Sequence, residues 1–154
     1  MHPHRRAARR LLVGAACRVT SIQGYDAPME RRRVSSGSPY ESVIGFARAV
    51  RVGDRVLVSG TAPIWPDGSC DPDPAIQMRR CIEIITEALE EAGATLADVV
   101  RTRTFLIDTS DAEAIQRVHG EAFGDIRPAS TMVVVRAFLD PRWKVEIEAE
   151  AVVG

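Results

Sequence analysis

His119 and Arg103 are the side chains whose type and position first suggest chemistry. His119 is the only histidine beyond residue 4, and an imidazole with a pKa near neutrality can donate or accept a proton. Alternatively, a lone histidine caps a helix or lies at an interface. A metal site is not expected, because the nearest second ligand, Glu121, is two residues away rather than the three or four that place two side chains on one helix face.

Arg103 is a charged residue in the middle of residues 98–107, a segment rich in β-branched residues that predicts a strand. Alternation along a strand places Arg101, Arg103 and Phe105 on one face. Arg103 could therefore bind an anionic group of a ligand. Alternatively, it is a solvated or interface arginine that pairs with a glutamate of the last predicted strand.

A hairpin over residues 46–59 precedes these residues, with its turn at Gly53 and Asp54. Gly60 follows at the end of the second strand. A glycine at this place lets the chain turn or lets a ligand approach the backbone.

The rest of the chain alternates between helix and strand patterns. Apolar residues fall on one face of each predicted helix, and Gly93 is a typical stop for the first one. The predicted elements are a helix over 75–92, a strand over 98–107, a helix from a cap at Asp111 to about residue 123, and strands over 130–138 and 144–153.

The resulting order, ββαβαββ, predicts an α+β domain whose sheet has both helices on one face. In the last strand apolar residues share one face and three glutamates share the other, Glu146, Glu148 and Glu150. The helix-free face is rich in charged and small residues. It must therefore meet water or line an assembly of subunits.

The composition favours small-molecule partners or copies of the same chain. The 154 residues, 45% of them apolar, are typical of one domain. The 20 basic and 21 acidic residues nearly cancel, so no overall electrostatic field would attract the domain to nucleic acid or an anionic membrane. Three cysteines without a C-x-x-C pair exclude a disulfide framework and favour a reducing, cytoplasmic compartment.

Residues 1–33 differ from the rest, since they contain basic clusters with few apolar residues between them. They are predicted to be a disordered extension or an over-long gene model with its true start at Met29. An export signal is the alternative, but the apolar stretch over 11–17 is short for one. The predicted domain spans residues 42–154.

Five segments occur in a characteristic order: I-G-F at 44–46, V-G-D-R-V-L-V-S-G at 52–60, E-A-G-A-T-L-A-D-V-V at 91–100, F-G-D-I-R-P-A-S-T at 123–131 and V-E-I-E-A-E-A at 145–151. Together they resemble the Rid family, the YjgF-like reactive intermediate deaminases. The resemblance implies a chorismate-mutase-like fold, a homotrimer with sites in clefts between subunits, and hydrolysis of enamines and imines to a carbonyl product and ammonia. It implies no cofactor and no metal.

The stretch R-P-A-S-T departs from the P-A-R-S of active members, whose arginine binds the substrate carboxylate with two parallel hydrogen bonds. Ser130 occupies the place of that arginine, followed by Thr131. Arg127 stands three residues earlier, so along an extended chain it points to the opposite face unless the backbone kinks at Pro128. The chain is similar to a Rid subgroup with R-P-A-S-T.

The resemblance also implies roles for residues elsewhere. Glu146 matches the glutamate that positions or activates the attacking water, a general-base task. Gly60 borders the site, Phe46 stands where active members often have a tyrosine, and His119 stands where the family usually has one. The predicted site therefore has Glu146 as its catalytic residue and, for substrate binding, Ser130, Thr131, Arg127, Arg103, Phe46, Gly60 and His119.

The predicted function is that of an enamine or imine deaminase. The alternative, which the loss of the family arginine favours, is a non-catalytic trimer that binds a metabolite in the same cleft. Ribonuclease activity has been attached to the family as well, but the neutral domain shows no basic and aromatic platform for RNA.

Overall fold

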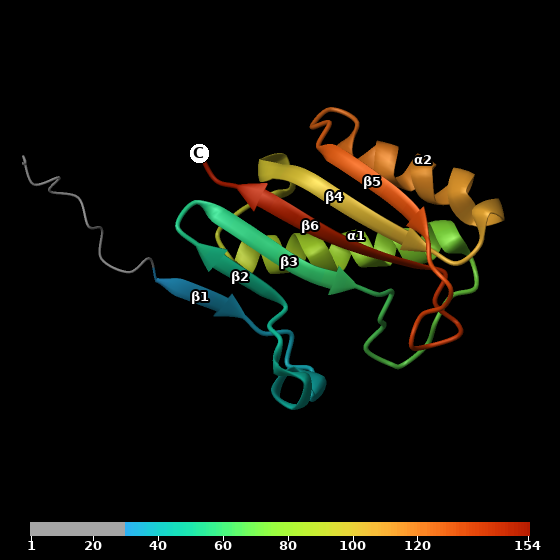
Figure 1. The fold of residues 1–154 in the computed structure, drawn as a ribbon, viewed down its shortest axis with the longest axis horizontal. Helices are drawn as coiled ribbons and strands as arrows, with labels where there is room; N and C mark the ends of the chain where they lie inside the picture. Colours follow the sequence, from blue (N-terminus) through green and yellow to red (C-terminus); the bar gives the residue numbers. More distant parts are fainter. Residues whose placement is uncertain (1–29) are drawn as a thin grey trace, which may run out of the picture.

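A six-stranded sheet with two helices on one face is the core of the computed structural model, which describes residues 30–154 (Figure 1). The strands lie in the order β1-β2-β3-β6-β4-β5, and only β4 and β5 are parallel neighbours within the described residues. The elements are β1 Arg31–Val34, a π-helical turn η1 Glu41–Gly45, β2 Ala49–Val52, β3 Arg55–Thr61, α1 Pro74–Glu91, β4 Val99–Leu106, α2 Ala112–Phe123, β5 Ala129–Val134 and β6 Val145–Val152, with short 3-10 turns before β4 and α2.

Local signals in the sequence explain the ends of α1. The Asp73 side chain accepts hydrogen bonds from the backbone N–H groups of Ala75 and Ile76, and Pro74 occupies the first turn, where its missing N–H does no harm. Gly93 follows the helix with a left-handed φ of 76°. The predicted helix over 75–92 is therefore confirmed within one residue at each end.

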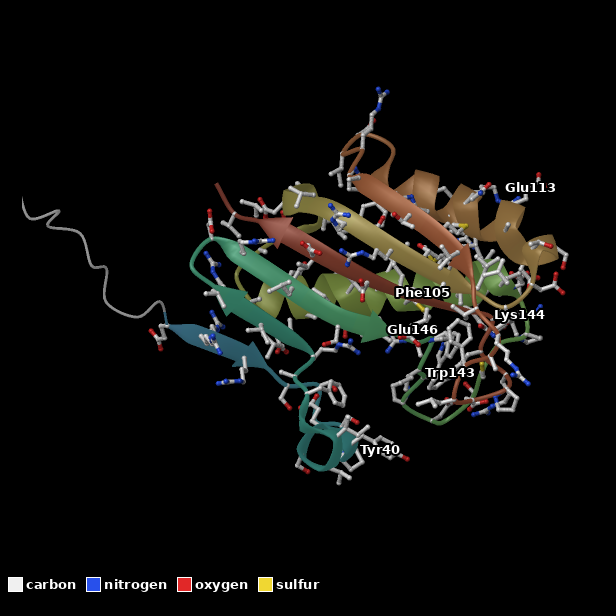
Figure 2. The ribbon with its side chains drawn as sticks, viewed as in Figure 1. Tyr40, Phe105, Glu113, Trp143, Lys144 and Glu146 are labelled. Carbon is white, nitrogen blue, oxygen red and sulfur yellow. The ribbon has the colours of Figure 1, made fainter. Side chains whose placement is uncertain are left out.

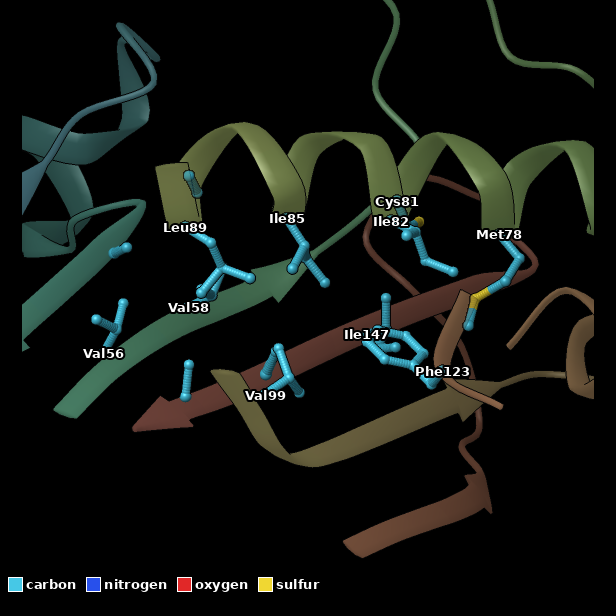
Figure 3. Packing of buried hydrophobic residues seen from close by; sticks show 14 of the residues in the cluster. Val56, Val58, Met78, Cys81, Ile82, Ile85, Leu89, Val99, Phe123 and Ile147 are labelled. Carbon is cyan, nitrogen blue, oxygen red and sulfur yellow. The ribbon is translucent and has the colours of Figure 1, made fainter. Parts of the chain in front are cut away.

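The core lies between α1 and the sheet, as Figure 3 shows for Met78, Ile85 and Leu89 of α1 above Ile147 and Val99. Every second residue of β6 is buried beneath the helices, while its three glutamates face the other way. The predicted alternation of the last strand is confirmed. The opposite sheet face, turned toward the viewer in Figure 1, carries no helix.

One strand, β1, was not predicted. It pairs antiparallel with β2 at the sheet edge, before the predicted domain start at residue 42. Its first three residues, Arg31–Arg33, lie in the segment predicted to be an extension, because three successive arginines give no apolar alternation and only Val34 is buried. The prediction for residues 1–29 lies outside the described residues.

Strand β5 ends at Val134, four residues earlier than predicted. Its one neighbour within residues 30–154, β4, ends at Leu106, which pairs with Val134, so the described ladder stops at this point. No helix within residues 30–154 is long and apolar enough to cross a membrane.

Candidate functional site

Glu146 lies on the helix-free face of the sheet, opposite Phe105 of β4 in the strand register (Figure 2). Its carboxylate is half-buried, and no described residue forms a hydrogen bond with it. Burial raises the pKa of Glu146, nearby Arg48 opposes this change, and Glu148 adds to it. A carboxylate of raised pKa without a fixed partner is suited to taking a proton from a bound water.

Gly60 makes room for this carboxylate. A Cβ atom at residue 60 would lie 2.2 Å from Oε1 of Glu146, far inside contact distance. The β3–β6 register shifts between Val58 and Thr61, which places the glycine at an irregularity of the strand. The structure therefore brings Gly60 and Glu146 together, as expected for a glycine that borders the site.

Arg48 is a member of this site that the sequence did not reveal. It is only 8% exposed, and its Nη2 donates to the carbonyl oxygens of Ser59 at 2.6 Å and Gly60 at 2.7 Å. Its Nε is buried and has no partner within the described residues. Burial lowers the pKa of Arg48, and the charge of Glu146 opposes this effect. Arg48 thus fixes the backbone under the Glu146 carboxylate and places a cation close to it.

Replacing this buried guanidinium by an apolar side chain tests its structural role. The Arg48→Met variant is expected to lose about 2–4 kcal/mol of unfolding free energy, because two charge-assisted hydrogen bonds from a buried group are removed. Arg55→Met is the control, since the exposed Arg55 pairs with Glu150 at 3.4 Å and such surface pairs contribute less than about 1 kcal/mol. Equal losses in urea unfolding would contradict the role given to Arg48.

Phe46 follows η1 and is partly exposed. The segment 40–46 projects from the edge of the sheet near β1 and β2, and Tyr40 is labelled on it in Figure 2. Tyr40, Val43 and Ile44 are also exposed. No hydrogen bond or contact in the structure ties Phe46 to Glu146, so its predicted part in the site stays a prediction.

Arg103 is paired with glutamates of the last strand, which was the alternative to a role in binding an anionic ligand. Its guanidinium forms ion pairs with Glu148 and, at 3.1 Å, with Glu150 on the neighbouring β6. Arg101 and Arg55 also approach Glu150. A guanidinium held by two carboxylates has less charge available to a further anion, and the predicted part of Arg103 in substrate binding stays a prediction.

Ser130 and His119 are brought together by a third residue, Thr102. Ser130 pairs in register with Thr102, and Thr102 Oγ1 donates to Ser130 Oγ at 3.0 Å. His119 Nε2 lies 2.9 Å from the same Thr102 oxygen, and its ring packs against Phe123 with the ring centroids 4.7 Å apart. Burial lowers the pKa of His119. Nothing in the sequence pattern distinguished Thr102 from the other threonines of β4.

Thr131 and Arg127 lie apart from the Ser130 hydroxyl. Thr131 pairs in register with Arg103 and so shares the helix-free face with it. Arg127 has a left-handed φ of 53°, so the backbone kinks at this residue rather than at Pro128. Its exposed side chain donates from Nε to the carbonyl of Gly124 at 3.3 Å, beyond the end of α2.

The functional side chains form two separate sets. The glutamate half-site, consisting of Arg48, Gly60 and Glu146, opens on the helix-free face. The serine half-site, consisting of Thr102, His119 and Ser130, belongs to the helix-bearing face, since Thr102 is buried beneath the helices. One chain therefore does not bring Ser130 and Glu146 together. Within residues 30–154 no three His, Cys, Asp or Glu side chains could jointly hold a metal ion.

Comparison with known proteins agrees with this fold. A family model described as endoribonuclease L-PSP matches residues 37–153. The crystal structure of Rv2704 from Mycobacterium tuberculosis, a member of the YjgF/YER057c/UK114 family, superposes with a TM-score of 0.75 and 48% identity over 80% of this chain and 100% of that one. The architecture is that of a YjgF-like α+β protein, as predicted. The chain belongs to this family, the YjgF or Rid family.

Two curated relatives are similar over most of this chain, and the name of one of them states an activity. The protein SCO2049 of Streptomyces coelicolor is 43% identical over 124 residues, which are 80% of this chain and 92% of the relative. The 2-iminobutanoate/2-iminopropanoate deaminase of Escherichia coli is 31% identical over 111 residues, 70% of this chain and 86% of the relative. The family thus includes an imine deaminase.

Proposed function

We propose that the protein is a cofactor-independent hydrolase that converts an enamine or imine to a carbonyl product and ammonia. The observation that carries the proposal is Glu146, a half-buried carboxylate without a hydrogen-bond partner among the described residues, held over Gly60 and close to the Arg48 cation. An enamine would first tautomerise to its imine. The similarity to an imine deaminase supports the same chemistry.

The reaction adds one water to the C=N bond. Glu146 takes a proton from the water as the water oxygen bonds to the imine carbon, and passes that proton to the nitrogen, which gives a neutral tetrahedral carbinolamine. Glu146 then takes the hydroxyl proton and delivers it to the nitrogen as the C–N bond breaks, so that the C=O bond forms and ammonia leaves. One imine and one water thus yield one carbonyl compound and one ammonia, with Glu146 as base and then acid.

The site is proposed to form between subunits of a homotrimer. A ligand that touches both half-sites must lie between two chains, because the half-sites belong to opposite faces of one sheet. The helix-free face supports an assembly, since it carries a shallow depression of about 500 Å³ lined by residues such as Arg33, Leu57, Arg103 and Glu148. The exposed apolar side chains of Val43, Ile44, Val133 and Val134 would also gain from burial.

Mixing two inactive variants tests this arrangement. Glu146→Gln damages only the glutamate half-site, and Ser130→Trp blocks only the serine half-site. If a site takes one half from each of two subunits, co-refolded mixtures in equal amounts recover about one quarter of the wild-type rate, because one interface in four combines two intact halves. Proteins mixed without co-refolding are the control. No recovery in mixed trimers, with both variants folded, would contradict a site shared between chains.

A second function, non-catalytic metabolite binding in the same cleft, is favoured by one observation. Ser130 stands where active members have their arginine, and Arg103 is already paired with Glu148 and Glu150. Under either function the partners are a small molecule and further copies of the chain, in the cytoplasm, with neither nucleic acid nor a membrane as a ligand.

A further inference from the structure

The hydrogen bonds of the serine half-site have a direction. Thr102 is fully buried and has a single hydroxyl proton, which it donates to Ser130 Oγ. The Thr102 oxygen is then free to accept, and the group within reach is His119 Nε2 at 2.9 Å, which must carry the proton of that bond. The one hydroxyl proton not yet used in this row of hydrogen bonds is that of Ser130. Because Ser130 is exposed, this proton is available to a ligand.

No charged side chain within residues 30–154 is hydrogen-bonded to Ser130, Thr102 or His119. Burial lowers the pKa of His119, which favours the neutral ring at physiological pH. The two arginines that were predicted to bind the substrate are engaged elsewhere. Arg127 donates to the Gly124 carbonyl, and Arg103 pairs with glutamates on the opposite face of the sheet. The side chain two residues along the same face of β5 is Met132, 3.9 Å from Gln116 Nε2. A carboxylate placed at Ser130 would therefore gain a hydroxyl donor but no cation from the serine half-site.

We propose that His119, Thr102 and Ser130 form a relay that presents the Ser130 hydroxyl as a neutral hydrogen-bond donor, and that the site selects imines whose neighbouring polar group is an uncharged carbonyl. The substrate class is then a 2-imino amide, ester or ketone rather than a 2-imino acid. A polarised donor chain strengthens the last hydrogen bond to such an oxygen. The proposal rests on the proposed function for its reaction, but it concerns binding alone.

Equilibrium binding of two stable product analogues tests the relay without any turnover. Pyruvamide carries an uncharged carboxamide and pyruvate a carboxylate, and their affinities for the assembled protein can be measured by calorimetry or NMR titration. Pyruvamide is expected to bind about tenfold or more tightly than pyruvate, since a carboxylate meets no cation at Ser130. Removal of the middle hydroxyl in Thr102→Val is expected to weaken pyruvamide binding about three- to tenfold.

Thr104→Val is a matched control. Thr104 is equally buried on the same face of β4, but its hydroxyl has no partner within the described residues. Its removal should leave both affinities unchanged. Ser130→Ala changes an exposed residue and so tests the relay even if Thr102→Val fails to fold. It should weaken pyruvamide binding at least as much as Thr102→Val does, because it removes the hydroxyl that meets the ligand.

Three results would overturn the proposal: tighter binding of pyruvate by the wild-type protein, an undiminished pyruvamide affinity in Ser130→Ala, or binding of neither analogue by a folded assembly. Selective, relay-dependent binding without hydrolysis of any imine would instead support the relay and refute the proposed reaction. Failure of the relay proposal and failure of the proposed reaction therefore give different results.

Discussion

The Glu146→Gln variant is expected to hydrolyse imines about 10²–10⁴-fold more slowly than the wild-type protein, the range typical for loss of a general base. The base must be ionised, and burial raises the pKa of Glu146. Wild-type activity should therefore rise with pH as Glu146 loses its proton. The residual activity of the variant should lack this rise. Rates measured across pH 4–8 would show the difference.

The same substitution is not expected to destabilise the fold. A carboxyl whose pKa is raised in the folded state binds more protons there than in the unfolded chain, so its stabilising contribution is present at low pH and is lost as pH rises through the folded-state pKa. Glutamine at this position should thus be tolerated at neutral pH. A variant that loses activity only because its urea midpoint collapses, or that keeps full activity, would contradict the role of Glu146.

Gly60→Ala is expected to lower imine hydrolysis about 10²-fold, because the new Cβ would lie 2.2 Å from Glu146 Oε1 and must displace the carboxylate. Gly120→Ala is a suitable control. A Cβ at residue 120 meets nothing within 4 Å, and the residue lies inside α2, so alanine should stabilise the protein by about 0.5–1 kcal/mol.

Both glycine variants are compared by their rates per folded subunit. A normal rate in Gly60→Ala would show that the carboxylate acts from another position. A crystal structure of that variant should show Glu146 turned away from residue 60, with the strand register of β3 and β6 intact.

The parts of the fold that follow from local signals were predictable. The helix α1 has an apolar stripe, a capping aspartate and a terminal glycine, and β6 alternates strictly, so both agree with the prediction within about one residue. The strand β1 has none of these signals, because it is held by backbone pairing with β2 and three of its residues are exposed arginines. Its existence depends on a partner that sequence patterns do not reveal.

The candidate site could be predicted from the sequence only as single residues, not as an arrangement. Glu146, Gly60, Ser130 and His119 were predicted, and the structure places them in two half-sites rather than one cleft. Arg48 and Thr102 were missed for a physical reason. Arginines at exposed and buried places of the hairpin look alike in sequence, and the burial of Thr102 beneath the helices arises only on packing.

The position of Arg127 shows the same limit. Residue counting along an extended chain assumes that the backbone stays extended, yet Arg127 adopts a left-handed conformation before β5 begins. Counting across that point cannot give the direction of its side chain. Within β5 the count holds, as the pairing of Ser130 with Thr102 and of Thr131 with Arg103 shows.

Imine hydrolysis by the assembled wild-type protein is the most direct test of the account. An amino-acid oxidase can generate the 2-imino acid, and loss of HCl from an N-chloro amino-acid amide can generate the uncharged imine, with semicarbazide trapping what is not hydrolysed. Trappable imine is expected to disappear faster in the presence of the protein, and the uncharged imine faster than the 2-imino acid. The Glu146→Gln protein is expected to accelerate this loss only slightly. If a folded trimer accelerates the hydrolysis of neither imine, the protein is not an imine hydrolase.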